Sequence, residues 1–262
     1  MSVTTVSSEA PYTSLRRYNG FMGLLHLVQG VIMLIISNSA ALPITTAYLT
    51  FKRDHVPPIF TVNETWGSLQ IGPAVALFLL LSAAAHFILA TVGYKWYVDN
   101  LKKKINYMRW YEYALSSSMM IVVIGMLVGV YDLSTLILLF TLNAMMNLFG
   151  LMMELHNQTT KKTNWTAFIF GCIAGIVPWV VLGLYFVGAV GDYADAIPGF
   201  VYAILASIFL FFNVFAINMF LQYKKFGPWK DYLFGERVYV LLSLVAKTAL
   251  AWQIWSGTLR PM

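Results

Sequence analysis

The chain has 262 residues, of which 59% are hydrophobic and 11% are charged, and its mean hydropathy is +0.70. A soluble domain of this length cannot bury so much apolar surface, so the composition indicates a membrane protein. The net charge of +6 comes from basic residues scattered between apolar blocks, which is typical of membrane orientation and not of a nucleic-acid-binding surface.

Seven stretches have the roughly 20 mostly apolar residues that a membrane-spanning helix needs. In chain order they are 20–37, 71–96, 107–131, 134–153, 165–190, 197–222 and 236–257. We therefore expect an all-α fold, a seven-transmembrane-helix bundle in which residues 1–262 form a single domain. For the first stretch a cleaved signal peptide is the alternative, because LRRYNG precedes an apolar run that ends near SNSAA. The length of this run and its polar residues His26 and Gln29 favour a retained helix.

The segment 38–70, between the first two spans, is too polar and too rich in proline to cross a bilayer. Its Thr, Tyr, Phe and Val residues on either side of RDHVPP predict a small β-hairpin lying over the membrane surface. The other connections between the spans are mostly short.

The positions of lysine and arginine predict the orientation of the bundle. If the N-terminus is cytoplasmic, thirteen basic residues lie on the inner side, Lys52, Arg53 and Arg260 lie on the outer side, and Lys247 lies within the last span, which accounts for all seventeen. This asymmetry predicts a cell-membrane protein with a cytoplasmic N-terminus and an extracellular C-terminus.

Disulfide and metal chemistry are not expected. Cys172 is the single cysteine, which excludes an internal disulfide, and its apolar setting in IFGCIAGIV predicts a buried, inert thiol. His26 and His86 are not joined by a Cys or carboxylate that would complete a metal-ligand set. We assign no role to His55 and His156, which fall in loops.

Lys247 stands alone in the apolar stretch LSLVAKTALAWQ, and once the other acidic residues are assigned to loops, Glu112 is its one anionic companion in the membrane interior. Lys247 lies about 15 Å along its helix from Arg237, and Glu112 lies about 9 Å along its helix from Asn106. Because helical side chains lean toward their own N-terminus, the lysine stem closes this difference of roughly 6 Å. The two groups are therefore expected to meet.

Two interpretations of this pair differ in chemistry. It can be a structural ion pair, but a buried pair adds little stability because desolvation offsets much of its attraction. It can also be a Schiff base and its counterion, in which the lysine amine is used chemically. We favour the second interpretation because ionisable residues inside a membrane are usually functional.

Four further blocks carry a family resemblance that covers nearly the whole chain: RWYEYALSSS at 109–118, FGCIAGIVPW at 170–179, PGFVYAILASIFLFFN at 198–213 and GERVYVLLSLVAKTALAWQIWSGTL at 235–259. In these blocks the chain resembles the heliorhodopsins, retinal-binding seven-helix proteins whose membrane orientation is reversed relative to other microbial rhodopsins. The resemblance implies a photoreceptor and not an enzyme. It also implies that Lys247 carries retinal as a protonated Schiff base, that Glu112 is the counterion, and that the protein is a homodimer, with the fourth and fifth spans at the interface.

Several polar residues are candidates for a network around the pair. Ser243 lies one turn before Lys247, so its hydroxyl could hydrogen-bond the Schiff base. Ser116 and Ser117 lie one turn after Glu112 and Tyr113 and could serve the counterion in the same way. Alternatively, each hydroxyl could bond to the backbone of its own helix. His26 and His86 lie at similar depth, and with Gln29 and Ser82 they could form a water-holding cluster near Glu112. The resemblance implies that this cluster receives the Schiff base proton after illumination. Asn106 and Asn143 are candidates to extend it.

The resemblance also implies an apolar and aromatic pocket for the retinal polyene. Without the resemblance, ordinary helix packing would be the preferred explanation for each of these residues. The candidate lining residues are Tyr113, Met146, Gly150, Pro178, Trp179 and Phe212. Asn147 departs from the expected pattern, because an apolar residue is expected beside the ring at this position.

The third span has no second carboxylate between Glu112 and Asp132, so a carboxylate relay is absent and we do not expect a pump of the usual design. A light-gated proton or ion channel is an alternative function, because the resemblance extends to a few viral members with conductance. A transporter without retinal that uses the Lys247–Glu112 pair is a further alternative. The basic connections 97–106 and 223–236 are candidates for docking a cytoplasmic signalling partner.

Overall fold

The computed structural model describes residues 9–191, 194 and 199–259. Within these residues, seven helices are long and apolar enough to cross a membrane, which confirms the predicted seven-helix class. They are α1 (Ala10–Ile36), α2 (Ile71–Ala90), α4 (Tyr107–Leu127), α5 (Leu133–His156), α6 (Thr166–Val190), α7 (Gly199–Lys224) and α8 (Tyr232–Ile254). The remaining helical segments are α3 (Tyr94–Leu101), a 3₁₀ turn at Gly227–Lys230 and a π-helical turn at Trp255–Leu259.

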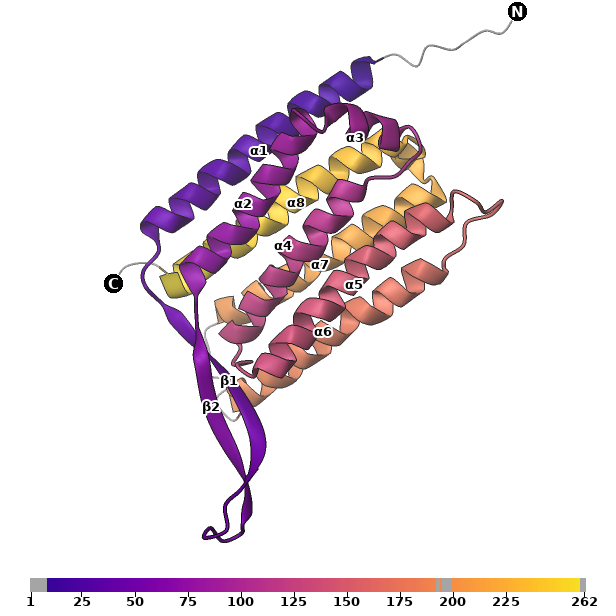
Figure 1. Cartoon of the computed structure of the whole chain (residues 1–262). Helices are drawn as coiled ribbons and strands as arrows, with labels where there is room; N and C mark the ends of the chain where they lie inside the picture. The colour runs from indigo at the N-terminus through magenta and orange to yellow at the C-terminus, as the bar shows by residue number, and fades with distance from the viewer. Residues whose placement is uncertain (1–8, 192–193, 195–198, 260–262) are drawn as a thin grey trace, which may run out of the picture.

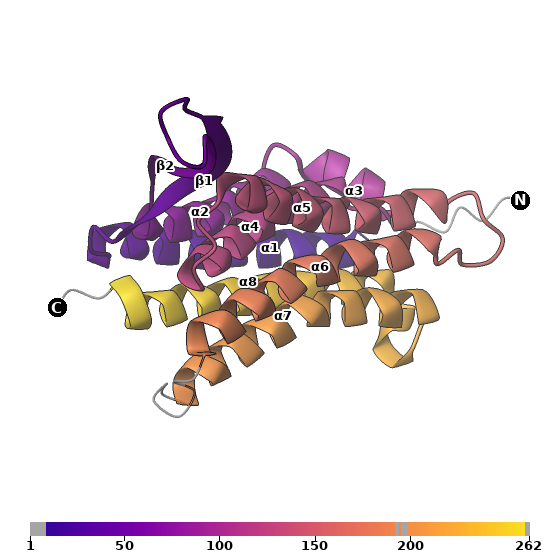
Figure 2. The same cartoon turned by 90° about the horizontal axis from the view of Figure 1, so that it is seen from below.

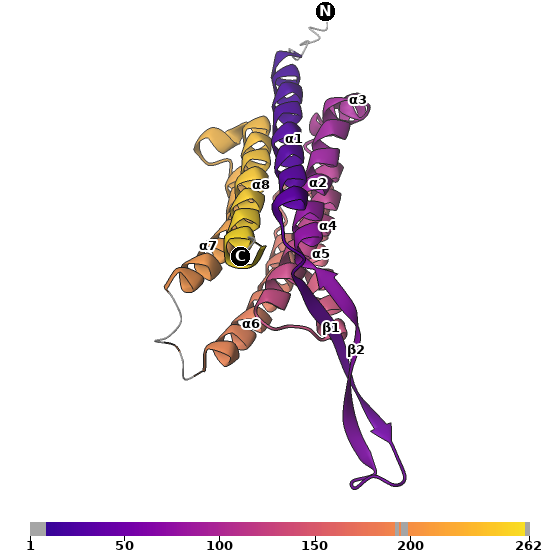
Figure 3. The ribbon, with the colours of Figure 1, turned by 90° about the vertical axis from the view of Figure 1, so that its left-hand side faces the viewer.

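The seven long helices run side by side (Figure 1). Helix α1 packs along α2, α2 along α4, α4 along α5 and α5 along α6, while α7 packs on α8 and α8 returns to α1. Figure 2 shows α7 and α8 on one side of the bundle and α2, α4 and α5 on the other. Helices α6 and α7 diverge from each other, as Figure 3 shows.

Local sequence explains where three of these helices begin. Each starts after an Asn or Asp whose side chain accepts a hydrogen bond from a backbone N–H of the first turn, which stabilises a helix start. These residues are Asn106 before α4, Asp132 before α5 and Asp231 before α8.

The predicted hairpin is confirmed, and it is longer than a small turn over the membrane. Strands β1 (Ala41–Phe51) and β2 (Ile59–Gln70) pair antiparallel on either side of the RDHVPP segment. The base of the hairpin is tied to the bundle by a 2.9 Å hydrogen bond from Thr45 N to Tyr131 O. Its distal half projects away from the helices and does not lie across their ends (Figure 3).

Two predicted span boundaries are wrong, because hydropathy detects neither a helix that extends beyond its apolar run nor a turn that ends a helix within one. Helix α1 begins ten residues before the predicted start at Gly20, and its Arg16 Nε donates a 2.7 Å hydrogen bond to Ala90 O at the end of α2. Helix α2 ends at Ala90 and not at residue 96, and after a turn the chain continues as the separate helix α3. The predicted start of the sixth span, at residue 197, lies outside the described residues.

The two ends of the bundle differ in the chemistry of their interior. Toward the end that carries β1 and β2, here called the hairpin end, the core is apolar and includes Val75, Phe78, Ile121 and Val123. Toward the opposite end, here called the α3 end, the interior contains buried charged and polar side chains. The candidate site lies where these two regions meet.

Candidate functional site

The structure brings Lys247 of α8 and Glu112 of α4 together in the interior of the bundle. Lys247 Nζ donates a hydrogen bond of 3.0 Å to Glu112 Oε1, and both side chains are buried. The ammonium also lies 5.1 Å from the centre of the Tyr113 ring, within the range of a cation–π contact. The predicted contact between Lys247 and Glu112 is therefore confirmed.

Two serines complete the immediate surroundings of the pair. Ser243 Oγ, one turn before Lys247, accepts a 3.0 Å hydrogen bond from Lys247 Nζ. Ser82 Oγ of α2 donates a 2.6 Å hydrogen bond to Glu112 Oε1, so one carboxylate oxygen serves both the lysine and the serine. Ser116 is fully buried one turn beyond Glu112 on α4.

The two candidate histidines stack on each other beside this group. The rings of His26 and His86 are 5.5 Å apart between centroids with an interplanar angle of 13°. His86 Nδ1 lies 2.8 Å from Asn19 Oδ1, and this asparagine was not among the sequence candidates. Gln29 does not join the cluster, because its Oε1 accepts a 3.3 Å hydrogen bond from Trp252 Nε1 on α8.

Most of the predicted pocket residues line two adjacent cavities, and the smaller one reaches Lys247. A small cavity of about 40 Å³, here called the inner cavity, is lined by Lys247, Ser243 and Ser117. A larger one of about 520 Å³, here called the apolar cavity, is lined by Trp179 and Gly150. Both are lined by Tyr113, Met146, Asn147, Phe212 and Phe215, so they are adjacent. Pro178 is buried within α6 and lines neither cavity.

A small polar cluster forms one wall of these cavities. Ser117 Oγ accepts hydrogen bonds from Asn143 Nδ2 at 2.7 Å and from Asn147 Nδ2 at 3.0 Å, and it donates one to Tyr113 O at 2.6 Å. These bonds explain how Asn147, the departure from the expected apolar residue, is tolerated at a buried position. Ser117 and Asn143 therefore belong to this polar cluster and do not hydrogen-bond to Glu112.

The expectation that Glu112 is the one carboxylate of the interior is wrong. Arg109 of α4 is buried between Glu154 of α5 and Glu236 of α8 and makes an ion pair and hydrogen bond with each. Asn106 joins the same cluster, since its backbone N–H bonds Glu154 at 2.9 Å and its side chain bonds Glu236 at 2.8 Å.

This Arg109 cluster of Asn106, Arg109, Glu154 and Glu236 was missed because its charged members lie near helix ends, where sorting by hydropathy assigns them to the membrane surface. One signal was available in the sequence. Arg109 lies three residues before Glu112 and therefore on the same face of α4, which is the face directed into the bundle. A charge on that face needs a buried partner.

The prediction of a buried Cys172 is also wrong. Its side chain is exposed on α6, and together with the exposed Ile173 and Ile176 it lines the apolar cavity. In a membrane bundle an apolar neighbourhood does not distinguish the interior from the lipid-facing surface, since both are apolar.

Seven long apolar helices around a buried lysine–carboxylate pair are typical of the microbial rhodopsins, a class of light-sensing membrane proteins. A family model described as Heliorhodopsin matches residues 15–259, and the chain belongs to the heliorhodopsin family. A comparison with curated proteins finds no match. Membership in this family indicates a photoreceptor and not a classical enzyme, with retinal as the chromophore of rhodopsins in general.

Proposed function

We propose that this protein is a photosensory receptor in which retinal is bound to Lys247 as a protonated Schiff base and Glu112 is the counterion. The observation that carries the proposal is the position of Lys247 Nζ, 3.0 Å from Glu112 Oε1 and at the wall of the inner cavity. The cofactor fits the residues present, since a polyene needs an apolar, aromatic pocket and the adjacent apolar cavity is lined by Trp179 and Phe212.

Retinal, when bound, supplies light absorption and isomerisation, and the chain supplies charge placement and a shaped pocket. Glu112 stabilises a positive charge on the Lys247 nitrogen, and Ser82 holds the carboxylate in place through its 2.6 Å hydrogen bond. Ser243 gives the same nitrogen a neutral hydrogen-bonding partner at 3.0 Å. The resting state is therefore a compensated charge pair in the buried interior of the bundle.

We propose that illumination moves the proton from the Lys247 nitrogen into the polar group formed by Glu112, Ser82, His86 and His26. This group lies on the side of the pair that faces the α3 end, whereas the core toward the hairpin end is apolar. Loss of the charge pair would relax the contact between α4 and α8 and shift the helices toward a signalling form. A cytoplasmic partner would dock on the basic connections 97–106 and 223–236, and a homodimer would form through α5 and α6.

Reconstitution with retinal tests the proposal directly. All-trans-retinal is added to the purified apoprotein, to Lys247→Arg and to the matched control Lys230→Arg, and visible spectra are recorded. Lys247→Arg keeps a cation but cannot form an imine, so we expect a red-shifted band for the wild type and for Lys230→Arg and none for Lys247→Arg. Helical circular dichroism checks that all three are folded. A missing wild-type band would favour the retinal-free transporter, and a band in Lys247→Arg would disprove the Schiff base at this position.

A second measurement separates the sensor from a pump or a channel. We expect vesicles that contain the retinal-bound protein to show neither a light-induced pH change sensitive to an uncoupler nor a photocurrent. The physical reason is that the core toward the hairpin end is apolar. Between Glu112 and Asp132 the sequence has no carboxylate that could relay a proton. A steady photocurrent would establish the channel alternative.

A further inference from the structure

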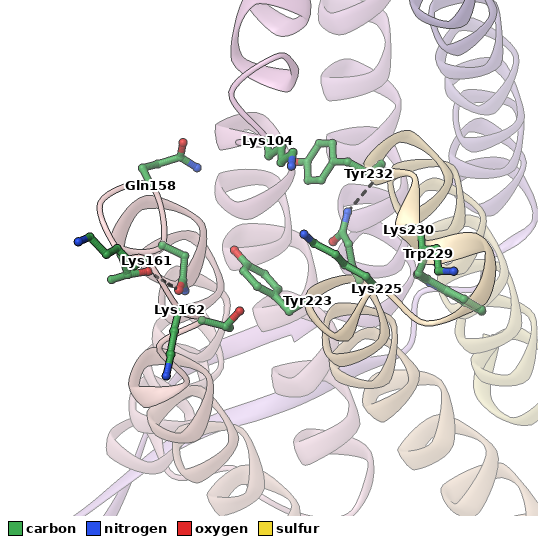
Figure 4. A pocket seen from close by; sticks show the side chains of 13 residues that line it. Lys104, Gln158, Lys161, Lys162, Tyr223, Lys225, Trp229, Lys230 and Tyr232 are labelled. Carbon is green, nitrogen blue, oxygen red and sulfur yellow. Dashed lines mark hydrogen bonds between the residues drawn. The ribbon is translucent and has the colours of Figure 1, made fainter.

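A second cavity lies at the α3 end of the bundle, well away from Lys247. Its volume is about 220 Å³, and its walls come from three connections between helices: α3–α4, α5–α6 and α7–α8 (Figure 4). Tyr223, Tyr232 and the buried Gln222 lie deeper than the exposed lysines around them. We call it the lysine cavity.

The lysine cavity concentrates positive charge without compensation. No Asp or Glu is among its thirteen lining residues, and none of its lysines forms an ion pair within the described part of the chain. In Figure 4 Lys104 lies beside Tyr232 and Lys225 points toward Tyr223, while Lys161 and Lys162 stand on the α5–α6 connection. The lining lysines are Lys104, Lys161, Lys162, Lys225 and Lys230.

The walls of this cavity are held in place by hydrogen bonds. Asn157 Oδ1 accepts a 2.7 Å bond from Asn164 N and a 3.0 Å bond from Thr160 Oγ1, which closes the α5–α6 connection on itself. Gln222 Nε2 donates a 3.2 Å bond to Tyr232 O, which ties the end of α7 to the start of α8 (Figure 4). A site whose walls are fixed in advance loses less entropy when a ligand binds.

Two of the lysines occupy backbone positions that favour glycine. Lys104 has φ 61° and Lys225 has φ 53°, and they are the two non-glycine residues with positive φ in the described chain. Each follows a helix end in which its own N–H and the next N–H bond back to that helix, the motif in which glycine is usual. Lysine therefore stands at both positions at a conformational cost that glycine would avoid, and both lysines line one cavity.

We propose that the lysine cavity binds a small anion that carries phosphate groups. Five lysines, with the hydroxyl of Thr163 and the second amide hydrogen of Gln158, supply the charge and the hydrogen-bond donors that phosphate oxygens require. The volume of about 220 Å³ is below the roughly 300–1,000 Å³ of sites for drug-sized ligands, which fits a phosphate or a lipid headgroup better than a peptide segment. The phosphate can belong to a soluble molecule or to an anionic lipid.

The test uses inorganic pyrophosphate as the probe and the full-length, retinal-bound protein in nanodiscs of phosphatidylcholine. The decisive variant is Lys104→Gly/Lys225→Gly, which removes two ammonium groups and relieves the backbone at the same time, so loss of folding cannot explain loss of binding. The matched control is Lys103→Gln/Lys224→Gln, which removes the same charge from two neighbouring lysines that do not line the cavity. Thermal unfolding is measured for all three proteins.

Titration calorimetry should show pyrophosphate binding to the wild type, at least about tenfold weaker binding to the glycine variant, and a change below about threefold in the control. Nanodiscs with added phosphatidylglycerol, analysed by native mass spectrometry, identify the source. Retention of that lipid by the wild type and its loss in the glycine variant would assign the phosphate to a lipid headgroup. Absence of both kinds of binding, an equal loss in the control, or tighter binding of a glutamate-rich peptide than of pyrophosphate would overturn the proposal.

Discussion

At the scale of single residues, Glu112 Oε1 is the atom on which the site depends, because Lys247 Nζ and Ser82 Oγ both donate to it. Helical spacing was sufficient to predict the Lys247–Glu112 contact and the role of Ser243 as a neighbour. It was not sufficient for Gln29, which turns toward Trp252, because the direction of a long side chain depends on contacts with another helix.

Replacing Glu112 by Gln should move the visible band of the retinal-bound protein to longer wavelength. The carboxylate stabilises a positive charge held close to the Lys247 nitrogen, and without it the charge is shared more evenly along the polyene. Absorption spectra of Glu112→Gln and of the exposed control Glu64→Gln provide the comparison. A Glu112→Gln spectrum that coincides with the wild type would remove Glu112 from the role of counterion.

Gly150 illustrates how one missing side chain shapes the pocket. A Cβ at this position would overlap the indole of Trp110, which is held by a 2.7 Å hydrogen bond from its Nε1 to Glu154. Gly150→Ala should therefore destabilise the protein by about 1–3 kcal/mol, the usual cost of overpacking. In Gly175→Ala the new methyl group meets the flexible end of Met146, so a smaller cost is expected. Equal melting temperatures for the two variants would contradict this explanation.

At the scale of elements, charged side chains and not only apolar packing hold the α3 end of the bundle together. The Arg109 cluster joins α4, α5 and α8, and Tyr232 Oη adds a 3.3 Å hydrogen bond to Glu154. The cluster lies between the Lys247–Glu112 pair and the lysine cavity, because Arg109 is one turn from Glu112 and Tyr232 lines that cavity. The Arg109 cluster thus separates the Lys247–Glu112 pair from the α3 end of the bundle.

Arg109→Gln should be strongly destabilising, because it leaves two buried carboxylates without their cation. Breaking a buried ion pair by removing one partner typically costs about 3–5 kcal/mol. Thermal unfolding in detergent, followed by circular dichroism, measures the effect against Arg17→Gln, in which an exposed arginine of α1 is removed. If both variants unfold within about 0.5 kcal/mol of the wild type, the cluster is not a structural link.

At the scale of the whole molecule, the orientation in the membrane determines what each end can do. The unequal distribution of lysine and arginine predicts that the α3 end is cytoplasmic and the hairpin extracellular. With this orientation the lysine cavity faces the cytoplasm, where soluble phosphate compounds and anionic lipid headgroups are available.

Cysteine labelling of intact cells tests this orientation. In a Cys172→Ser background, Val56→Cys at the hairpin tip, where the side chain is 93% exposed, should react with a membrane-impermeant maleimide. Thr159→Cys in the exposed α5–α6 connection should react only after lysis. The reverse pattern would place the hairpin inside the cell.

The sequence by itself determined the seven-helix class, the hairpin and the meeting of Lys247 with Glu112. Hydropathy, turn residues and helical periodicity are local properties that can be counted along one chain. They place a residue at a depth and on a face of its own helix, and for an isolated pair of charges that information is sufficient.

Only the tertiary structure decided which charges near the helix ends turn inward and which apolar faces meet lipid. Arg109, Glu154 and Glu236 look like surface residues in the sequence but meet in the interior, while Cys172 looks buried but is exposed. The lysine cavity likewise combines three connections that are far apart in the chain. These features depend on the rotation and packing of whole helices, and since lipid and protein interior are both apolar, no hydropathy pattern distinguishes them.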